Sequence, residues 1–181
     1  MTRPWSRVVG LDLSLTSTGI SDGYQYEVVQ TNSGQRTEER LDRLTRAVVR
    51  YVLSGDLPVL AVIEGSSFGS RGPGHEETAT LRLMVRHRLW RLAIPFAIVP
   101  PTTLKLFTTG EGRASKQQMA EAMRGVFRGD IGSIKVKDGR YDVADATALA
   151  AMGYHHIGFP CSDPARPDAA DKVEWPDLIS D

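Results

Sequence analysis

The first third of the chain alternates short apolar runs with turn residues, which is the pattern of consecutive strands. Arg7 to Leu13 is β-branched and apolar apart from Asp12, and Ser14 to Gly19 supplies turn residues before Ile20 resumes the apolar pattern. Tyr24 to Thr31 is another run of strand type. We therefore expect three strands joined by turns.

The middle of the chain alternates helical and strand patterns. Apolar residues recur at helical spacing over Gln35 to Leu53 and again over Glu76 to Leu92. Between and after them, Leu57 to Glu64 and Ile94 to Val99 are apolar runs of strand length. This order predicts an α/β fold built on a mixed sheet.

The last part of the chain predicts helices and then a tail. Thr102 to Phe107, Ser115 to Phe127 and the alanine-rich Tyr141 to His155 have helical patterns. Residues 160–181 are rich in Pro and Asp and have little periodicity, so we expect an acidic, mobile tail after a single domain at 1–159.

Composition narrows the class of protein. The 181 residues are 41% hydrophobic and 24% charged, which is typical of a globular domain with one substantial core. We see no apolar stretch of secretory-signal or membrane-spanning length, so we expect a cytoplasmic protein that does not enter a membrane. The single cysteine, Cys161, cannot form an internal disulfide and has no partners at zinc-finger spacing.

A net charge of zero at first argues against a nucleic-acid partner, because phosphate binding usually leaves a basic footprint. The charge is unevenly distributed, however. Residues 160–181 carry six acids against two bases, whereas the rest of the chain carries 20 bases and 16 acids. The predicted domain is therefore basic, and more so if some of its acids bind metal ions.

Four acids stand in unusually apolar surroundings. Asp12 interrupts an apolar strand, Glu64 ends another, and Asp142 and Asp145 lie three apart on one face of an alanine-rich helix. Buried carboxylates are costly unless a cation meets them, and oxygen-only ligands favour Mg²⁺ or Mn²⁺ over zinc. Taken singly, these acids have ordinary explanations. Asp12 could be a turn former before Ser14, Glu64 a surface strand end and Asp145 an exposed helix residue. Together they predict a divalent-metal site.

Four segments, in this order, resemble the motifs of the RuvC family of Holliday junction resolvases. The resemblance spans about residues 7–157, and its most specific part is the Gly-x-Gly-Arg-Ala-x-Lys run inside the third segment. The segments are Gly10 to Ser14 with Thr18-Gly19, Val62 to Glu64, Leu104 to Met119, and Tyr141 to Ala146.

The resemblance implies an RNase H-like fold, in which a central five-stranded mixed sheet is flanked by helices. It also implies a homodimer that makes paired nicks near a four-way DNA junction. By position, the family's acidic cluster, which holds two Mg²⁺ ions with Mn²⁺ as a substitute, corresponds to Asp12, Glu64, Asp142 and Asp145. Its residues near the scissile strand and the DNA correspond to Lys105, Arg113, Lys116 and Phe68, although Phe68 follows Glu64 by four residues rather than the family's three.

We hypothesise that Asp12 bridges the two ions, that Glu64 and Asp145 complete their shells, and that Asp142 binds one ion or orients its water. Lys116 would steady the phosphate, and Lys105 would do the same or bind the DNA backbone.

Several alternatives stay open. The same acids would suit an RNase H-like nuclease acting on RNA–DNA hybrids or flaps, and the fold alone would suit a non-catalytic branched-DNA-binding module. We do not expect a sugar-kinase or actin-like ATPase, because such a protein needs two domains of this fold and 181 residues cannot supply them. The arginines of the helix over 35–53 could contact phosphates or form a solvated face. The helix over 76–92 is our candidate dimer interface, but its Arg82, Arg86, Arg88 and Arg91 could instead face DNA.

Overall fold

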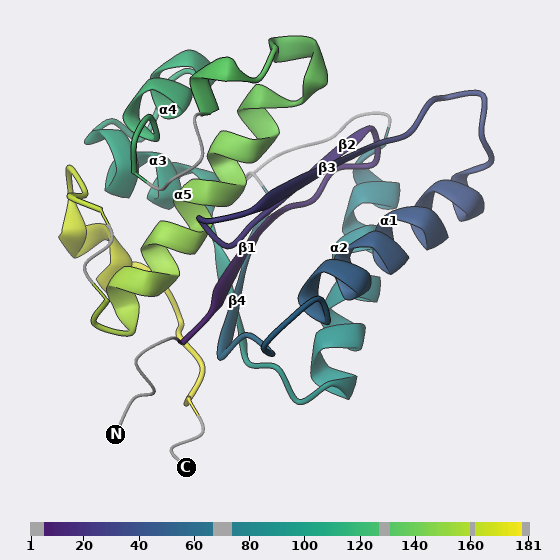
Figure 1. Ribbon diagram of the computed structural model, residues 1–181, viewed down its shortest axis with the longest axis horizontal. Coiled ribbons are helices and arrows are strands. Elements are labelled where there is room, and N and C mark those ends of the chain that lie inside the picture. The colour runs from purple at the N-terminus through teal and green to yellow at the C-terminus, as the bar shows by residue number, and fades with distance from the viewer. Residues whose placement is uncertain (1–5, 67–73, 127–130, 160–161, 179–181) are drawn as a thin grey trace.

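The computed structural model describes residues 6–66, 74–126, 131–159 and 162–178, and these form a five-stranded sheet between two layers of helices (Figure 1). The strands lie in the order β3-β2-β1-β4-β5. β1 pairs antiparallel with β2 and parallel with β4, so the sheet is mixed, as expected. The strands are β1 Val8–Asp12, β2 Ser17–Ser21, β3 Tyr26–Gln30, β4 Leu60–Glu64 and β5 Phe96–Val99.

Helices cover both faces of the sheet. One face carries α1 Thr37–Val52 and α2 His75–Arg91, which pack on each other, and the other carries α5 Arg140–His156 (Figure 1). On the α5 side lie the shorter α3 Pro101–Thr109 and α4 Lys116–Ala122, and the 3₁₀ turns η1 Ile131–Ser133, η2 Val136–Asp138 and η3 Pro167–Lys172.

Helix α4 is shorter than its sequence pattern predicts. It begins as expected, since Ser115 and Gln118 form a reciprocal capping box at its N-terminus. We expected it to reach Phe127, but it ends at Ala122, and Gly125 follows with a φ of 71°, which a continuing helix cannot adopt. Phe127 itself lies outside the described residues.

The sheet separates two apolar cores. Because side chains alternate along a strand, Val9 and Leu11 of β1 enter the core beneath α1 and α2, while Val8 enters the core beneath α5. β4 divides in the same way, with Ile63 on the first side and Val62 on the second. Consecutive strand residues therefore serve opposite halves of the molecule.

Helix α5 lies directly on the backbone of the sheet. A Cβ added at Gly10 would lie 1.9 Å from the Ala146 carbonyl oxygen, and one at Gly19 would lie 2.2 Å from that of Asp142. Only glycine fits at these two strand positions, because any side chain would overlap the helix backbone. This approach holds α5 against β1 and β2.

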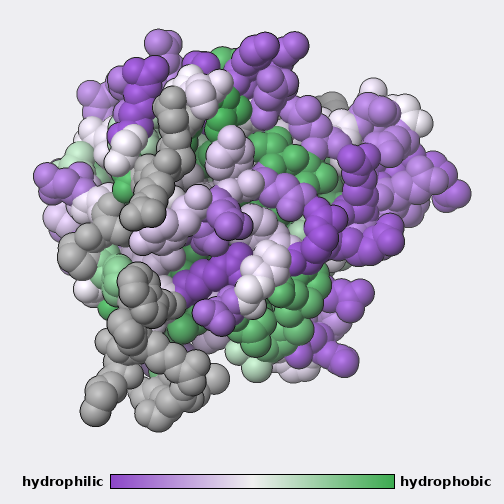
Figure 2. All heavy atoms as spheres, in the orientation of Figure 1, coloured by the Kyte–Doolittle hydropathy of each residue, from purple (hydrophilic) through white to green (hydrophobic). Residues whose placement is uncertain are grey.

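The arginines of α1 belong mainly to a solvated, ion-paired surface. Arg46 pairs with Asp42 and Arg50 pairs with Glu27. Figure 2 shows hydrophilic residues over the side of the molecule where Figure 1 places α1. Arg40 differs, because it is only 7% exposed and its guanidinium donates to Thr31 Oγ1 at 2.9 Å. The solvated face is thus the better interpretation for most of this helix.

The C-terminal segment differs from the mobile tail that we expected. Ala169, Ala170 and Val173 are buried in the core beneath α5. The Trp175 ring stacks on His156, with 4.2 Å between ring centroids. The backbone N–H of Arg166 donates to the Phe107 carbonyl at 3.1 Å. Residues 162–178 therefore pack on α3 and α5, through apolar residues too irregularly spaced to give a periodic signal.

The remaining expectations concern membrane-spanning helices and the residues Phe68 and Cys161. Within the described ranges, no helix has both the length and the apolar character needed to cross a membrane. Phe68 and Cys161 lie outside the described residues.

Candidate metal and phosphodiester site

Strand pairing brings Asp12 and Glu64 together. Each is the last residue of its strand, and the neighbouring parallel strands align Leu11 with Ile63, so the two acids that follow are adjacent. Since Leu11 and Ile63 point towards α1 and α2, alternation directs both carboxylates to the α5 face. The carboxyl ends of parallel strands are a common position for functional groups.

Helix α5 brings the other two acids to the same end of the sheet. Asp142 lies in its first turn and Asp145 follows one turn later, on the same face. The contact of Gly19 with the Asp142 backbone fixes this end of α5 against β2, and Asp12 pairs with Gly19 in the β1–β2 register. All four acids therefore meet where β1, β2, β4 and α5 converge.

Burial and mutual repulsion determine the charge state of these acids. Asp12 is 8% exposed, and burial followed by the charges of Glu64, Asp145 and Asp142 raises its pKa well above the usual 3.8. Burial also raises the pKa of Glu64, and the charge of Arg82 opposes that shift. At neutral pH these two buried carboxyl groups therefore hold a proton more readily than free ones.

Two lysines lie within electrostatic reach of the acids. The pKa of Asp145 is raised to about 7, first by burial and then by the charge of Glu64, whereas Lys116 and Lys105 oppose the shift. Lys116 also lowers the pKa of Asp12 and Glu64. Lys116 is the first residue of α4 and is exposed, and Lys105 is half-buried on α3. The site is therefore acidic inside, with ammonium groups at its edge.

The donor set fits a hard divalent cation, although the side chains do not form a ready-made cage. Across residues 6–66, 74–126, 131–159 and 162–178, no group of three or more His, Cys, Asp or Glu is arranged to hold a metal ion. Asp142 is instead held by Ser17. Buried carboxylates that raise one another's pKa are nevertheless the oxygen donors that Mg²⁺ and Mn²⁺ prefer.

Comparison with curated proteins finds similar sequences of one kind, although no protein-family model matches the chain. A crossover junction endodeoxyribonuclease RuvC from Gloeobacter violaceus is 28% identical over 162 residues, covering 83% of this chain and 90% of that protein. The protein of the same name from Synechococcus sp. WH7803 is 28% identical over 157 residues, covering 82% of this chain and 97% of its own length. The chain is therefore distantly similar in sequence to RuvC proteins.

Solved RuvC structures have the same fold. The structure titled as Thermus thermophilus RuvC in complex with Holliday junction substrate aligns with a TM-score of 0.68 at 20% identity, covering 88% of this chain and 99% of that one. A second structure of Thermus thermophilus RuvC aligns with a TM-score of 0.65 and covers 87% of this chain. The predicted RNase H-like fold is therefore confirmed.

Two residues that contact the candidate acids carried no signal in the sequence. Ser17 Oγ donates to Asp142 Oδ2 at 2.5 Å. Arg82 Nε donates to the Glu64 carbonyl at 3.0 Å, and its guanidinium lowers the pKa of the Glu64 carboxyl. Ser17 lies where the sequence indicates a turn, and Arg82 is one of four arginines on α2, so neither was distinguishable from its neighbours.

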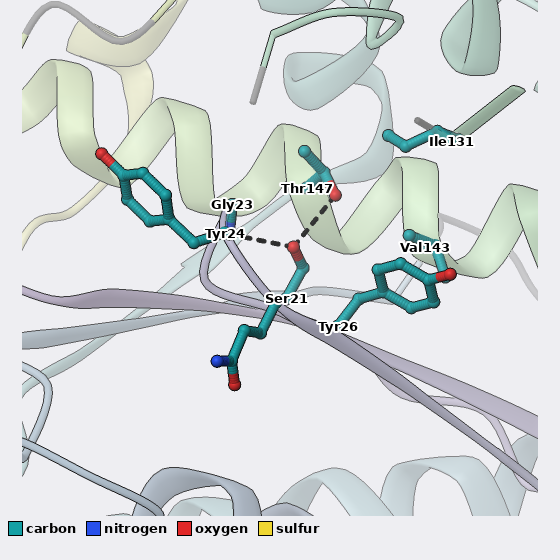
Figure 3. Close-up of a pocket in the computed structure, with 8 residues that line it drawn as sticks. Ser21, Gly23, Tyr24, Tyr26, Ile131, Val143 and Thr147 are labelled. Atoms are coloured by element: carbon teal, nitrogen blue, oxygen red, sulfur yellow. Dashed lines mark hydrogen bonds between the residues drawn. The ribbon is translucent and has the colours of Figure 1, made fainter. Parts of the chain in front are cut away.

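The remaining candidates lie around this centre. Arg113 is exposed in the turn that precedes α4. A small hollow of about 10 Å³ lies between the β2–β3 turn and α5, lined by residues that include Ser21, Tyr26 and Thr147 (Figure 3). Thr147 Oγ1 donates to Ser21 Oγ at 3.0 Å across it. It has room for about one water molecule, and none of the four acids lines it, so it is separate from the candidate metal site.

Proposed function

We propose that this chain is a metal-dependent endonuclease that resolves four-way or otherwise branched DNA by paired nicks. The observation that carries the proposal is the convergence of four carboxylates, two from strand ends and two from α5. Burial and the charges of the other three raise the pKa of Asp12. Similarity to RuvC proteins supports the assignment to DNA junctions, because these curated relatives are named crossover junction endodeoxyribonucleases.

Asp12, Glu64, Asp142 and Asp145 would hold up to two Mg²⁺ ions, with Mn²⁺ as a substitute. Bound ions of this kind supply an activated water and stabilise the charge on the departing oxygen. Asp12 is the most central ligand, since its pKa responds to the other three acids. Asp142 would either bind one ion or orient its water.

The basic residues act on the phosphate and the DNA strand. Lys116, whose charge reaches Asp12, Glu64 and Asp145, would stabilise the developing negative charge on the scissile phosphate. Lys105 would bind the neighbouring phosphate backbone. Arg113 and Phe68 are the remaining candidates for DNA contact.

A two-fold dimer would suit a substrate that is cut symmetrically. On α2, Leu83 is 62% exposed and Trp90 is 68% exposed, and their spacing of two helical turns places them on one face. Exposed apolar groups of this size favour an interface, so we propose that this face of α2 joins two copies.

The decisive experiment incubates the purified chain with a synthetic four-way junction and Mg²⁺. We expect symmetrical nicks from the native chain, junction binding without nicking from Asp145→Asn, and native behaviour from Asp138→Asn, which changes an exposed acid in η2. Undiminished nicking by Asp145→Asn would remove Asp145 from the mechanism.

Substrate comparison separates the related activities. Preferential cutting of an RNA–DNA hybrid or a flap would assign a different RNase H-like nuclease. Binding of the junction without metal-dependent cutting by the native chain would assign a non-catalytic module instead.

A further inference from the structure

The connection between β1 and β2 is held together by its own hydroxyl groups. Ser14 Oγ donates to the Ser17 carbonyl at 2.8 Å and accepts from the Ser17 N–H at 3.1 Å. Thr18 Oγ1 donates to the Ser14 carbonyl at 2.9 Å. These reciprocal bonds constrain the backbone at Ser17 more than turn geometry alone would.

Neighbouring elements fix the other side of the same connection. The buried guanidinium of Arg40 on α1 donates to the Leu15 carbonyl at 3.2 Å, and Thr31 Oγ1 donates to the same carbonyl at 2.5 Å. The Thr31 N–H donates to the Thr16 carbonyl at 3.0 Å. A buried cation is thus used to hold a loop, and the loop presents Ser17 in a defined position.

Ser17 uses this position to hold one of the four acids. Its hydroxyl donates to Asp142 Oδ2 at 2.5 Å, across 125 positions of sequence. The contact of Gly19 with the Asp142 carbonyl fixes the backbone beside it. Asp142 therefore has its helix, its carbonyl and one carboxylate oxygen constrained, which selects one orientation for the other oxygen.

We propose that Ser17 is a positioning residue that orients Asp142 as a ligand for a divalent metal ion. The inference rests on the proposed function and adds a residue to its site. Without the hydroxyl, the Asp142 side chain would turn away from the other acids, because repulsion separates like charges that nothing holds together. Hydrogen bonds to metal-binding carboxylates typically change metal affinity or activity by about 10–100-fold.

The test measures Mn²⁺ binding to the full-length chain without DNA, by electron paramagnetic resonance and by calorimetry. Ser17→Thr and Ser17→Val are a matched pair, because they differ only in a hydroxyl against a methyl group. We expect Ser17→Thr to bind Mn²⁺ like the native chain, and Ser17→Val and Ser17→Ala to bind about 10-fold more weakly. Thr16→Ala removes an exposed hydroxyl that contacts Ser14 Oγ at 3.4 Å, and should bind normally.

The outcomes separate the two proposals. If the native chain binds no Mn²⁺, the proposed function fails and the role of Ser17 fails with it. If Asp142→Asn weakens binding but Ser17→Val binds as well as Ser17→Thr, or more tightly, Ser17 does not position Asp142 although the proposed function stands. Thermal unfolding in EDTA verifies that every variant is folded. If Ser17→Ala does not fold, the comparison of Ser17→Thr with Ser17→Val decides the outcome.

Discussion

At the scale of single residues, Asp12 illustrates how a buried acid opposes stability. It is 8% exposed at the end of a strand whose other residues are buried, and three further acids act on it. Such a group costs folding free energy until a cation meets it. The proposed metal binding and the stability of the metal-free chain would therefore make opposite demands on this position.

We predict that Asp12→Asn stabilises the metal-free chain while abolishing its response to metal. Removing one repelling carboxylate should raise the free energy of unfolding in EDTA by on the order of 1 kcal/mol, which is about 2–4 °C in a chain of this size. The native chain should be stabilised by Mn²⁺ and the variant should not. Thermal unfolding with EDTA and with Mn²⁺ measures both, and a less stable variant in EDTA would count against repulsion.

We predict that Lys116→Ala lowers the rate of nicking by about 100-fold, the effect typical of losing one group that stabilises transition-state charge. Junction binding should change only a few-fold, because Lys116 is one of many basic residues. Single-turnover cleavage and a binding assay measure the two effects. Lys135→Ala, an exposed lysine before η2, is the control, and an equal loss in both variants would contradict the prediction.

The acids were recognisable in the sequence and their partners were not. Asp12 and Asp145 stand among apolar residues, where a carboxylate needs an explanation. The Gly-x-Gly-Arg-Ala-x-Lys run was the most specific part of the family resemblance. Ser17 gave no such signal, because a serine beside glycine and threonine is typical of any turn. Its role depends on Asp142, 125 positions away, and no local pattern encodes that contact.

At the scale of elements, α1 is joined to the β2–β3 turn through Tyr51. Its hydroxyl donates to the Gln25 carbonyl at 2.7 Å and accepts from the Asp22 N–H at 3.2 Å. Burial, and then the Asp22 carboxylate, raise the pKa of Tyr51 above its usual 10.0. The folded chain therefore favours the neutral phenol, which alone can donate to Gln25.

We predict an alkaline loss of stability that depends on Tyr51. A pKa raised by folding stabilises the chain fully below pH 10, and the contribution is lost as pH rises from there through the folded-state value. Tyr51→Phe should be less stable at pH 8, having lost its hydrogen bonds, but should decline less steeply above pH 10. Urea unfolding at several pH values measures how the free energy of unfolding of each protein depends on pH. An equal decline above pH 10 in the native chain and in Tyr51→Phe would contradict the role of Tyr51.

Two neighbouring residues, Trp175 and Glu174, test whether the C-terminal segment packs on the rest of the chain. Trp175 stacks on His156 and its Nε1 donates to the Ala170 carbonyl at 2.9 Å, whereas Glu174 is exposed. We predict that Trp175→Ala lowers the free energy of unfolding by about 1–2 kcal/mol, and that Glu174→Ala changes it by less than about 0.5 kcal/mol. Denaturant unfolding measures both, and equal, small effects would favour the mobile tail.

Periodicity explains which elements were predictable. The ends of the helices over 37–52 and 75–91 were expected to within about two residues. Each helix has apolar residues at helical spacing that pack into the core between these helices and the sheet. Residues 162–178 have no such stripe and pack through contacts with α3 and α5 that are distant in sequence. Composition alone therefore indicated disorder for a segment that docks.

At the scale of the whole molecule, the proposed dimer is testable without DNA. We predict that Leu83→Glu combined with Trp90→Glu yields a monomer, because two charges would be buried in the apolar face of α2. Light scattering during size-exclusion chromatography measures the mass. Val136→Glu, a change at an exposed apolar residue of η2, should leave the mass of the native chain unchanged. A native chain that is already monomeric would refute the interface.

The alternation along β1 limits where the chain tolerates a change in length. Leu11 and Asp12 are consecutive, yet Leu11 lies in the apolar core beneath α1 and α2, whereas Asp12 faces α5. Deleting a single residue upstream within β1 would exchange the two faces, burying the carboxylate among aliphatic side chains and putting a leucine in its place. Viable insertions and deletions in such a gene should therefore fall between the strands, or occur in compensating pairs.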